Sequence, residues 1–280
     1  MLKVMIEIPE ALTIAKQIAD SLIGKQIVKV MAASSPHGFA WYFGDPVHYP
    51  ARLENRRITG AFAHGGKVEI EVEEMRIALG EGVRIRLYKA AEIYPTKHQL
   101  LVEFDDRSAM VCTVQMYGCL YAFPEGDNDD DFYYAVGKQK PAVFSKEFDL
   151  MYFRSLLDQE VLKGSAKAFL ATQQRIPGLG NGVVQDILWQ SGIHPKRKMN
   201  TLSDNEIDSL FGKVKAVLAE MTAAGGRCTE KDLYGRSGGY QVVMCSAGLG
   251  HPCPRCGTPI TAMSYMGGKV YLCSSCQKLD

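Results

Sequence analysis

The sequence predicts an α+β protein of several domains: an N-terminal helix with a β-sandwich or barrel, a helical domain, and a C-terminal β-hairpin that binds zinc. Three observations predict this class: short β-rich runs in the first half, helical periodicity in the second, and two Cys-x-x-Cys pairs near the end. A length of 280 residues favours more than one domain, and 46% hydrophobic with 22% charged residues is typical of a globular protein.

The first half begins with a helical pattern. Pro9 and Glu10 open an apolar-periodic run that Gly24 ends, which is the usual punctuation of a helix. From residue 26 to about residue 135, eight or so short β-rich runs are separated by Gly, Pro, Asp and Asn turns. We therefore expect residues 1–136 to form a helix and a β-sandwich or barrel.

The second half has helical periodicity. Residues 137–145 are polar and contain a proline, so we expect a linker there. Ser203 and Glu206 form a capping box at the start of the longest helical pattern. We expect a helical domain over residues 146–240 and a zinc finger over residues 241–280. The helical patterns cover residues 147–157, 165–174, 181–191 and 203–223.

Charge is divided unevenly along the chain. From Gly137 onward, 18 Lys and Arg face 12 Asp and Glu, a net charge of +6. Residues 1–136 carry 14 basic and 19 acidic residues, a net charge of −5, and their acidic segment 126–131 is expected to be a solvated loop. A basic half suggests a polyanionic partner.

With no long apolar stretch and no signal-peptide pattern, we expect a soluble, cytoplasmic protein with no membrane partner.

Four cysteines have the spacing of a metal site. Cys253 and Cys256 form one pair, Cys273 and Cys276 form the other, and 16 residues separate the pairs. Four thiolates suit one tetrahedral zinc ion with no open position, so the predicted role is structural. The alternative is two disulfides, which an oxidising compartment would favour.

A glycine-rich segment, residues 175–182 (RIPGLGNG), lies between two helical patterns. Gly178 and Gly180 permit tight backbone geometry, and Asn181 stands where a helix N-cap belongs. Exposed N–H groups and the helix dipole would make an anion site there, with Lys196, Arg197 and Lys198 following. The alternative is an ordinary turn between two helices.

Together these segments resemble the formamidopyrimidine-DNA glycosylase and endonuclease VIII family of base-excision repair enzymes. The segments PGLGNGVVQDILWQSGIHP, CPRCGTP and VYLCSSCQK carry the resemblance, supported by YGRSGGYQ and EIPEALTIAKQI. The resemblance implies a helix–two-turn–helix domain beside the β-sandwich, and a monomer in a bacterial-type cytosol or nucleoid. Its expected partner is double-stranded DNA, damaged or abasic, held in a positively charged cleft with the damaged base flipped out.

The resemblance also implies roles for particular residues. The family's nucleophile is an N-terminal proline amine, which forms a Schiff base at C1′ of the damaged nucleotide. The neighbouring catalytic glutamate corresponds to Glu7, and a second carboxylate corresponds to Glu10, for which a first-turn helix charge is the alternative. The implied DNA-binding residues are Lys67, Gly180, Asn181 and, in place of a zinc-hairpin arginine, Lys269.

This sequence departs from the family at the nucleophile. Ile6 stands at the proline position, and four residues precede Met5. A chain that begins at Met5 would place Glu7 third and supply a primary amine, which can also form a Schiff base. The chain also departs from the family at three positions that contact DNA. The family's wedge methionine aligns with Glu81, and its arginine–phenylalanine pair aligns with Met116-Tyr117. Its hairpin arginine aligns with Gly268.

Three functions are therefore compatible with the sequence. The first is a DNA glycosylase with AP lyase activity that uses Glu7 and an amine other than proline. The second is a catalytically inactive relative that binds lesions or abasic sites. The third is a zinc-bearing module for protein or RNA binding on the same scaffold.

Overall fold

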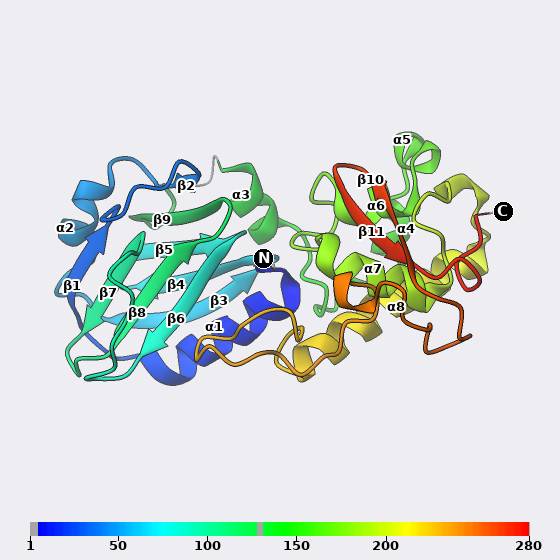
Figure 1. The fold of residues 1–280 in the computed structure, drawn as a ribbon. Coiled ribbons are helices and arrows are strands. Elements are labelled where there is room, and N and C mark those ends of the chain that lie inside the picture. Colours follow the sequence, from blue (N-terminus) through cyan, green and yellow to red (C-terminus); the bar gives the residue numbers. More distant parts are fainter. Residues whose placement is uncertain (1–4, 128–130, 280) are drawn as a thin grey trace.

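The computed structural model describes residues 5–127 and 131–279, and it places a β-rich half beside a helical half (Figure 1). Residues 1–4, and residues 128–130 within the acidic segment expected as a loop, lie outside the described residues. The described β-rich half contains α1 (Ile8–Leu22), β1 (Ile27–Ala32), β2 (Ala40–Trp41), η1 (Pro46–His48), α2 (Tyr49–Leu53), β3 (Ile58–His64), β4 (Lys67–Val72), β5 (Met75–Gly80), β6 (Val83–Tyr88), β7 (Leu100–Phe104), β8 (Ala109–Val114), β9 (Gly118–Pro124) and α3 (Phe132–Gln139).

The strands form a sandwich rather than a barrel. One sheet has the order β1-β7-β8-β6 and the other has the order β2-β9-β5-β4-β3, and apolar side chains from both sheets meet in one core. Strand β5 was missing from the sequence expectation. All of its residues are buried, Arg76 included, so exposure does not alternate along this strand.

The helical half contains α4 (Leu150–Ser155), α5 (Gln159–Lys163), α6 (Ala166–Ala171), α7 (Asn181–Ser191), η2 (Met199–Thr201), α8 (Asp204–Ala223) and η3 (Ser246–Gly248), followed by β10 (Thr261–Tyr265) and β11 (Gly268–Leu272). Helix α7 has the expected bounds, and Ser203 and Glu206 form the predicted capping box at the start of α8. Helix α3 continues to Gln139, within the segment expected as a linker.

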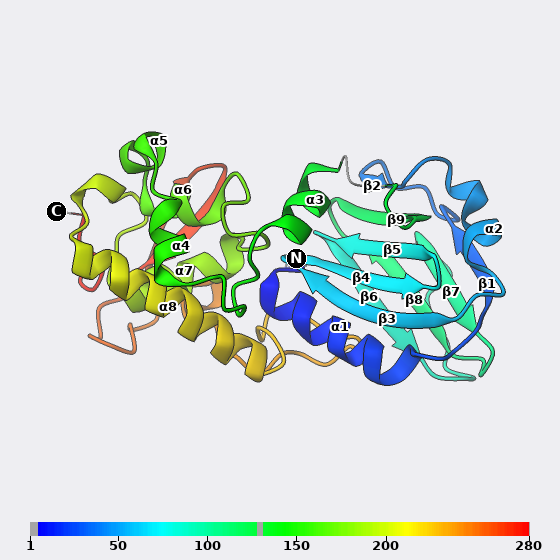
Figure 2. The same ribbon diagram turned by 180° about the vertical axis from the view of Figure 1, so that it is seen from behind.

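Helix α1 is shared by the two halves. Ile14, Ile18 and Leu22 belong to the sandwich core, whereas Ile8 belongs to the core of the helical half. Seen from behind, α1 runs along β3 and β4, and its first turn lies where the two halves meet (Figure 2). The start of α1 therefore lies at the junction, held by packing on both sides.

Within residues 5–127 and 131–279, we find no helix with the length and apolar character needed to cross a membrane.

Candidate active site

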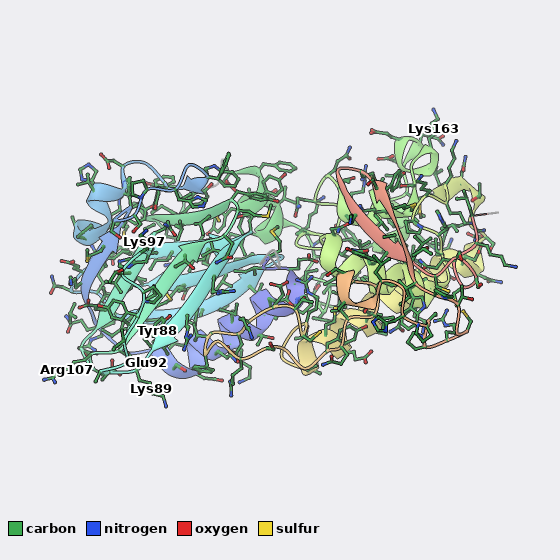
Figure 3. The ribbon with its side chains drawn as sticks, viewed as in Figure 1. Tyr88, Lys89, Glu92, Lys97, Arg107 and Lys163 are labelled. Atoms are coloured by element: carbon green, nitrogen blue, oxygen red, sulfur yellow. The ribbon has the colours of Figure 1, made fainter. Side chains whose placement is uncertain are left out.

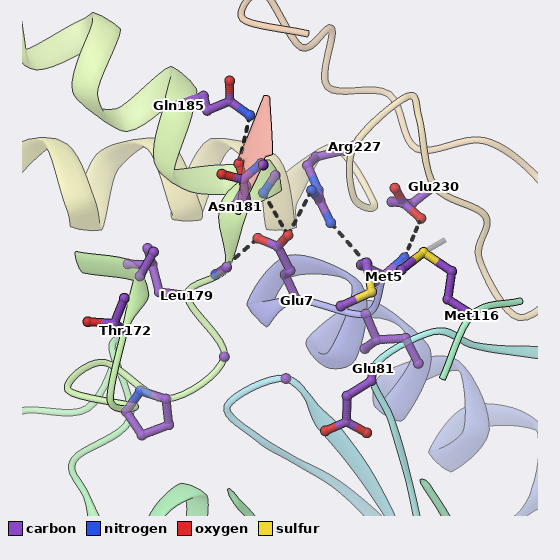
Figure 4. Close-up of a pocket in the computed structure, with 18 of the residues that line it drawn as sticks. Met5, Glu7, Glu81, Met116, Thr172, Leu179, Asn181, Gln185, Arg227 and Glu230 are labelled. Atoms are coloured by element: carbon purple, nitrogen blue, oxygen red, sulfur yellow. Dashed lines mark hydrogen bonds and ion pairs between the residues drawn. The ribbon is translucent and has the colours of Figure 1, made fainter. Parts of the chain in front are cut away.

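A cavity of about 830 Å³ lies where the two halves meet, and we call it the junction cavity (Figure 4). Its walls come from the start of the described chain, the strand ends of the sandwich, the start of α7, the segment after α8 and the C-terminal hairpin. Charged residues in its lining are Glu7, Lys67, Glu81, Asp131, Lys167, Arg227 and Glu230.

Glu7 is anchored to the N-terminus of α7. Its carboxylate accepts hydrogen bonds from the backbone N–H groups of Gly180 (3.2 Å), Gly182 (2.8 Å) and Val183 (2.9 Å). The predicted anion site at this helix start is thus filled by a carboxylate of the chain itself, because α1 directs Glu7 into it. These N–H groups, including that of Gly180, are therefore not free for a phosphate.

Gly180 and Gly182 allow this close approach. A Cβ at Gly180 would lie 2.8 Å from the Glu7 carboxyl carbon, and one at Gly182 would lie 1.5 Å from Nη1 of Arg227. Gly180 is also the N-cap of α7, so Asn181 is the first helical residue and not the cap that its side chain suggested.

Arg227 connects the carboxylates at the start of α1. It is 3% exposed, and its guanidinium donates to Glu10 at 2.7 Å and to Glu7 at 3.3 Å. Nη2 of Arg227 also donates to the carbonyl oxygen of Met5 at 3.1 Å. Glu10 accepts further bonds from the backbone N–H groups of Arg227 and Glu7. Glu10 thus lies in a buried ion-pair network rather than at the cavity surface.

Glu230 lies beside the first described residue. Its Oε2 accepts a hydrogen bond from the Met5 nitrogen at 3.2 Å, and its Oε1 accepts one from the Thr229 hydroxyl at 3.2 Å. Burial raises the pKa of Glu230 to about 7; Arg227 opposes the increase, and the charges of Glu10 and Glu7 add to it. Glu230 therefore holds a proton more readily than an exposed glutamate does.

The raised pKa predicts how stability depends on pH. A carboxyl whose pKa is higher in the folded state than in the unfolded state stabilises the folded protein at pH values below the unfolded-state pKa. This stabilisation is lost as the pH rises through the folded-state pKa, which is about 7 for Glu230. Between pH 4 and pH 8 we expect the free energy of unfolding of the unmodified chain to fall by up to about 3 kcal/mol because of this group, and we expect no such fall in Glu230→Gln. Urea denaturation of both chains across this range measures the difference, and parallel stability curves would contradict it.

Lys67 is sequestered within the sandwich end of the cavity. Its ammonium lies 2.8 Å from Oε1 of Glu81 and 3.1 Å from Sγ of Cys119, and the side chain is 5% exposed. Burial opposes the charge, but Cys119 and Glu81 more than compensate and raise the pKa of Lys67 above its ordinary value. Lys67 therefore stays protonated and is a poor nucleophile. To contact a phosphate, it would first have to leave Glu81.

Asn181 and Lys269 are brought together by the fold. Both are exposed, and the amide of Asn181 lies 3.4 Å from the carbonyl oxygen of Lys269 on β11. Gln185 strengthens this contact, because it donates to the carbonyl of Asn181 and accepts from the N–H of Tyr271. The start of α7 and the C-terminal hairpin therefore present one continuous surface beside the cavity.

Charge around the cavity differs from the expected positive cleft. Among the lining residues, Glu7, Glu81, Asp131 and Glu230 are acidic, and the cations Lys67 and Arg227 are held in ion pairs. Basic side chains lie on the helical side instead, where Lys167 and Lys196 both contact the Tyr265 ring of the hairpin. The charged residues that line the cavity are thus mostly acidic, and the basic side chains Lys167 and Lys196 gather at the hairpin ring of Tyr265.

The four predicted cysteine ligands converge. Their sulfur atoms all lie within 4.8 Å of one another, with Cys253 and Cys276 3.9 Å apart and Cys256 and Cys273 3.4 Å apart. Sulfurs about 2.3 Å from a tetrahedral zinc ion would be separated by similar distances, whereas a disulfide needs about 2 Å. The donor set therefore fits a structural zinc ion.

The cysteine cluster is also attached to α7. Nε1 of Trp189 donates to the sulfur of Cys253 at 3.4 Å, and Arg255 donates to the carbonyl oxygen of Trp189. A bound zinc ion would thus fix the hairpin against the helix that holds Glu7, because metal ligands are oriented by such neighbours.

Loss of one ligand should release the ion. We expect Cys256→Ser to lower zinc content from about one per chain to near zero and to unfold the hairpin, since so small a module cannot bury enough apolar surface alone. Cys228→Ser, which changes a cysteine outside the cluster, is the matched control. Metal analysis of both purified proteins measures the effect, and full zinc content in Cys256→Ser would refute the four-thiolate site.

Comparisons with known proteins agree with this architecture. Residues 140–232 match the model of the formamidopyrimidine-DNA glycosylase H2TH domain. The formamidopyrimidine-DNA glycosylase of Listeria innocua is 36% identical over 189 residues, which are 65% of this chain and 67% of that one. That of Lactobacillus delbrueckii subsp. bulgaricus is 26% identical over 286 residues, covering 98% of this chain and all of the relative.

Solved structures show the same fold. The MutM (Fpg) protein of Thermus thermophilus superposes with a TM-score of 0.80 at 22% identity, covering 97% of this chain and 98% of that one. Lactococcus lactis Fpg in complex with DNA that contains an abasic site superposes with a TM-score of 0.82 at 22% identity, over 97% and 99% of the chains.

The match of residues 140–232 to the H2TH domain, together with the fold, is that of a glycosylase-type repair protein. The chain belongs to the formamidopyrimidine-DNA glycosylase family.

Sequence reasoning missed two residues of the site, Arg227 and Glu230. Both lie in a short segment after α8 that has no helical or strand periodicity, and their partners at the start of the described chain, such as Met5 and Glu10, are more than 200 residues away. Only Gly225 and Gly226 precede them as a turn signal, so the sequence offers no local pattern that predicts a buried arginine here.

Proposed function

We propose that this protein is a base-excision repair DNA glycosylase with AP lyase activity that acts on damaged or abasic double-stranded DNA. The observation that carries the proposal is the placement of the Met5 nitrogen at the wall of the junction cavity, beside Glu230 and the Glu7–Arg227 pair. A cavity of about 830 Å³ lies within the usual range for small-ligand sites, so it suits an extruded base.

In the described chain the nitrogens of Met5 and Ile6 are both peptide N–H groups, and the Met5 nitrogen becomes an amine only in a chain that begins at Met5. The Ile6 N–H donates to the carbonyl oxygen of Glu81 at 2.8 Å, which ties it to the sandwich. In a chain that begins at Met5, the Met5 nitrogen is a primary amine and attacks C1′, displacing the damaged base. The resulting Schiff base permits strand cleavage by elimination.

Glu7 and Glu10 act in this proposal as positioning carboxylates. Glu7 fixes the first turn of α1 against α7, and Glu10 holds Arg227, which in turn holds the Met5 carbonyl. A proton-transfer role for Glu7 would require one of its bonds to break, since backbone N–H groups and Arg227 already occupy the roughly four acceptor sites of the carboxylate.

The proposed DNA surface is formed by Asn181, Lys269 and the basic side chains near the hairpin. Asn181 and Lys269 are exposed and adjacent, and Lys196 is also exposed beside the hairpin ring of Tyr265. Phosphate contacts by such groups position a duplex without reading its sequence. A zinc ion held by the four cysteines would contribute structure only.

Borohydride trapping tests the proposal. A chain that begins at Met5 should form a covalent adduct with abasic-site duplex in the presence of borohydride, and mass determination of the natively produced N-terminus should find Met5 first. Absence of an adduct from both the full chain and the Met5 chain would refute the enzymatic proposal.

One observation favours the second candidate, a lesion-binding protein without catalysis: position 6 is isoleucine, and its nitrogen is a hydrogen-bonded peptide N–H. This candidate predicts tight, salt-dependent binding to abasic duplex with no adduct from either chain.

Opening the Lys67–Glu81 pair should strengthen DNA binding. In Glu81→Gln the ammonium of Lys67 loses its anionic partner and becomes available for a phosphate. Each phosphate neutralised steepens the salt dependence of binding, so we expect the slope of log K against log salt to increase by about 0.9. Titrations of abasic duplex at several salt concentrations measure this slope.

Glu92→Gln is the matched control, because Glu92 lies at the far end of the sandwich, away from the cavity (Figure 3). The same slope in Glu81→Gln and Glu92→Gln would show that Lys67 does not reach the DNA.

A further inference from the structure

Three carboxylates surround the start of the described chain, and they differ in how many donors they already accept. The two oxygens of Glu7 bind backbone N–H groups of α7 and Arg227. The two oxygens of Glu10 bind the backbone and side chain of Arg227 and the N–H of Glu7. Since a carboxylate has about four acceptor sites, Glu7 and Glu10 have little capacity left for a proton.

Glu230 is different. One of its oxygens accepts from the Met5 nitrogen and the other from the Thr229 hydroxyl, so both oxygens retain acceptor capacity. Its side chain is buried but lines the junction cavity, where Figure 4 shows it joined to Met5. Among these carboxylates it is the one in direct contact with the nitrogen.

We propose that Glu230 takes the proton from the Met5 amine and returns it to the departing oxygen of an abasic-site substrate. This inference rests on the proposed function, since it requires a chain that begins at Met5. The partner chemistry is an aldehyde at C1′ of a ring-opened abasic site.

The step balances in atoms and protons. The nitrogen forms a bond to C1′ as the carbonyl double bond opens. Its two protons then pass through Glu230 to the oxygen, which leaves as water, and a C=N bond remains. The carboxylate of Glu230 is regenerated, and no oxidant or reductant takes part.

The electrostatic surroundings suit this exchange. Burial and the charges of Glu10 and Glu7 raise the pKa of Glu230 to about 7, while Arg227 opposes them. An α-amino group has an ordinary pKa near 8, so part of the Met5 amine is unprotonated at neutral pH. Arg227 donates to the carbonyl of Met5, and this adjacent positive charge disfavours the protonated amine.

The test measures the rate of borohydride-trapped adduct for the Met5 chain and its Glu230→Gln variant between pH 6 and pH 9. At pH 7 we expect Glu230→Gln to be about 100-fold slower or more, because proton transfer by a positioned group typically contributes roughly 10²–10⁴-fold. Above pH 8 the variant should recover, since water then removes the proton from the amine. Glu230→Asp, which keeps a carboxylate, should lie between the two.

Glu160→Gln, which removes an exposed carboxylate in the first turn of α5, is the matched control and should behave as the unmodified chain. Equal rates at pH 7, or a loss in Glu230→Gln that does not change with pH, would overturn the role of Glu230 while leaving the proposed function intact. No adduct from either the unmodified Met5 chain or the full chain would instead refute the proposed function, and this inference with it.

Discussion

Arg227→Met should destabilise the protein by about 3–5 kcal/mol, the cost of removing one partner from a buried ion pair. Arg227 is the cation that neutralises Glu7 and Glu10, and all three side chains are at most 6% exposed. Without it, two carboxylates would remain buried within a few ångströms of each other. Urea denaturation at pH 7 measures the effect.

Arg236→Met provides the control for this prediction. Arg236 lies in the same segment and pairs with Asp232, but its side chain is 68% exposed, so its loss should cost less than about 1 kcal/mol. If the two variants unfold at the same urea concentration, Arg227 does not hold the junction together.

Glu7→Gln should reduce adduct formation by about 100-fold, the cost of misplacing a reacting group by roughly 1 Å, and leave duplex binding within a few-fold of the unmodified protein. A glutamine would direct its NH₂ group at N–H donors of α7 or at Arg227, and no rotamer can satisfy all four contacts. The first turn of α1 would then shift, and the Met5 nitrogen would move with it.

Two measurements on the Met5 chain separate the effect on adduct formation from the effect on duplex binding. Borohydride trapping reports the chemistry, and titration of abasic duplex at fixed salt reports binding, with Glu160→Gln again as the control. Adduct formation by Glu7→Gln at the full rate would show that this carboxylate has no part in the reaction.

The sequence predicted the fold and the metal ligands well because their signals are local. Periodicity marked α7, the capping box marked α8, and the spacing of Cys-x-x-Cys pairs marked the cysteine cluster. Strand β5, which is buried throughout, was not predicted.

The candidate site was harder to predict because its interactions are long-range. The sequence placed Glu7, Lys67 and Asn181 in the site. It gave no sign that Glu7 would fill the anion site at α7, or that Glu81 would bind Lys67. Such pairings depend on how separate elements meet, which residue types and spacing do not reveal.

Helix α1 has one further consequence. Because Ile8 and Leu12 pack against the core of the helical half while Ile14, Ile18 and Leu22 pack in the sandwich core, the two halves cannot part at this helix without breaking one of these contacts. The segment just before α1 is likewise held from both sides, since the Ile6 N–H donates to Glu81 of the sandwich and Glu7 accepts from the start of α7.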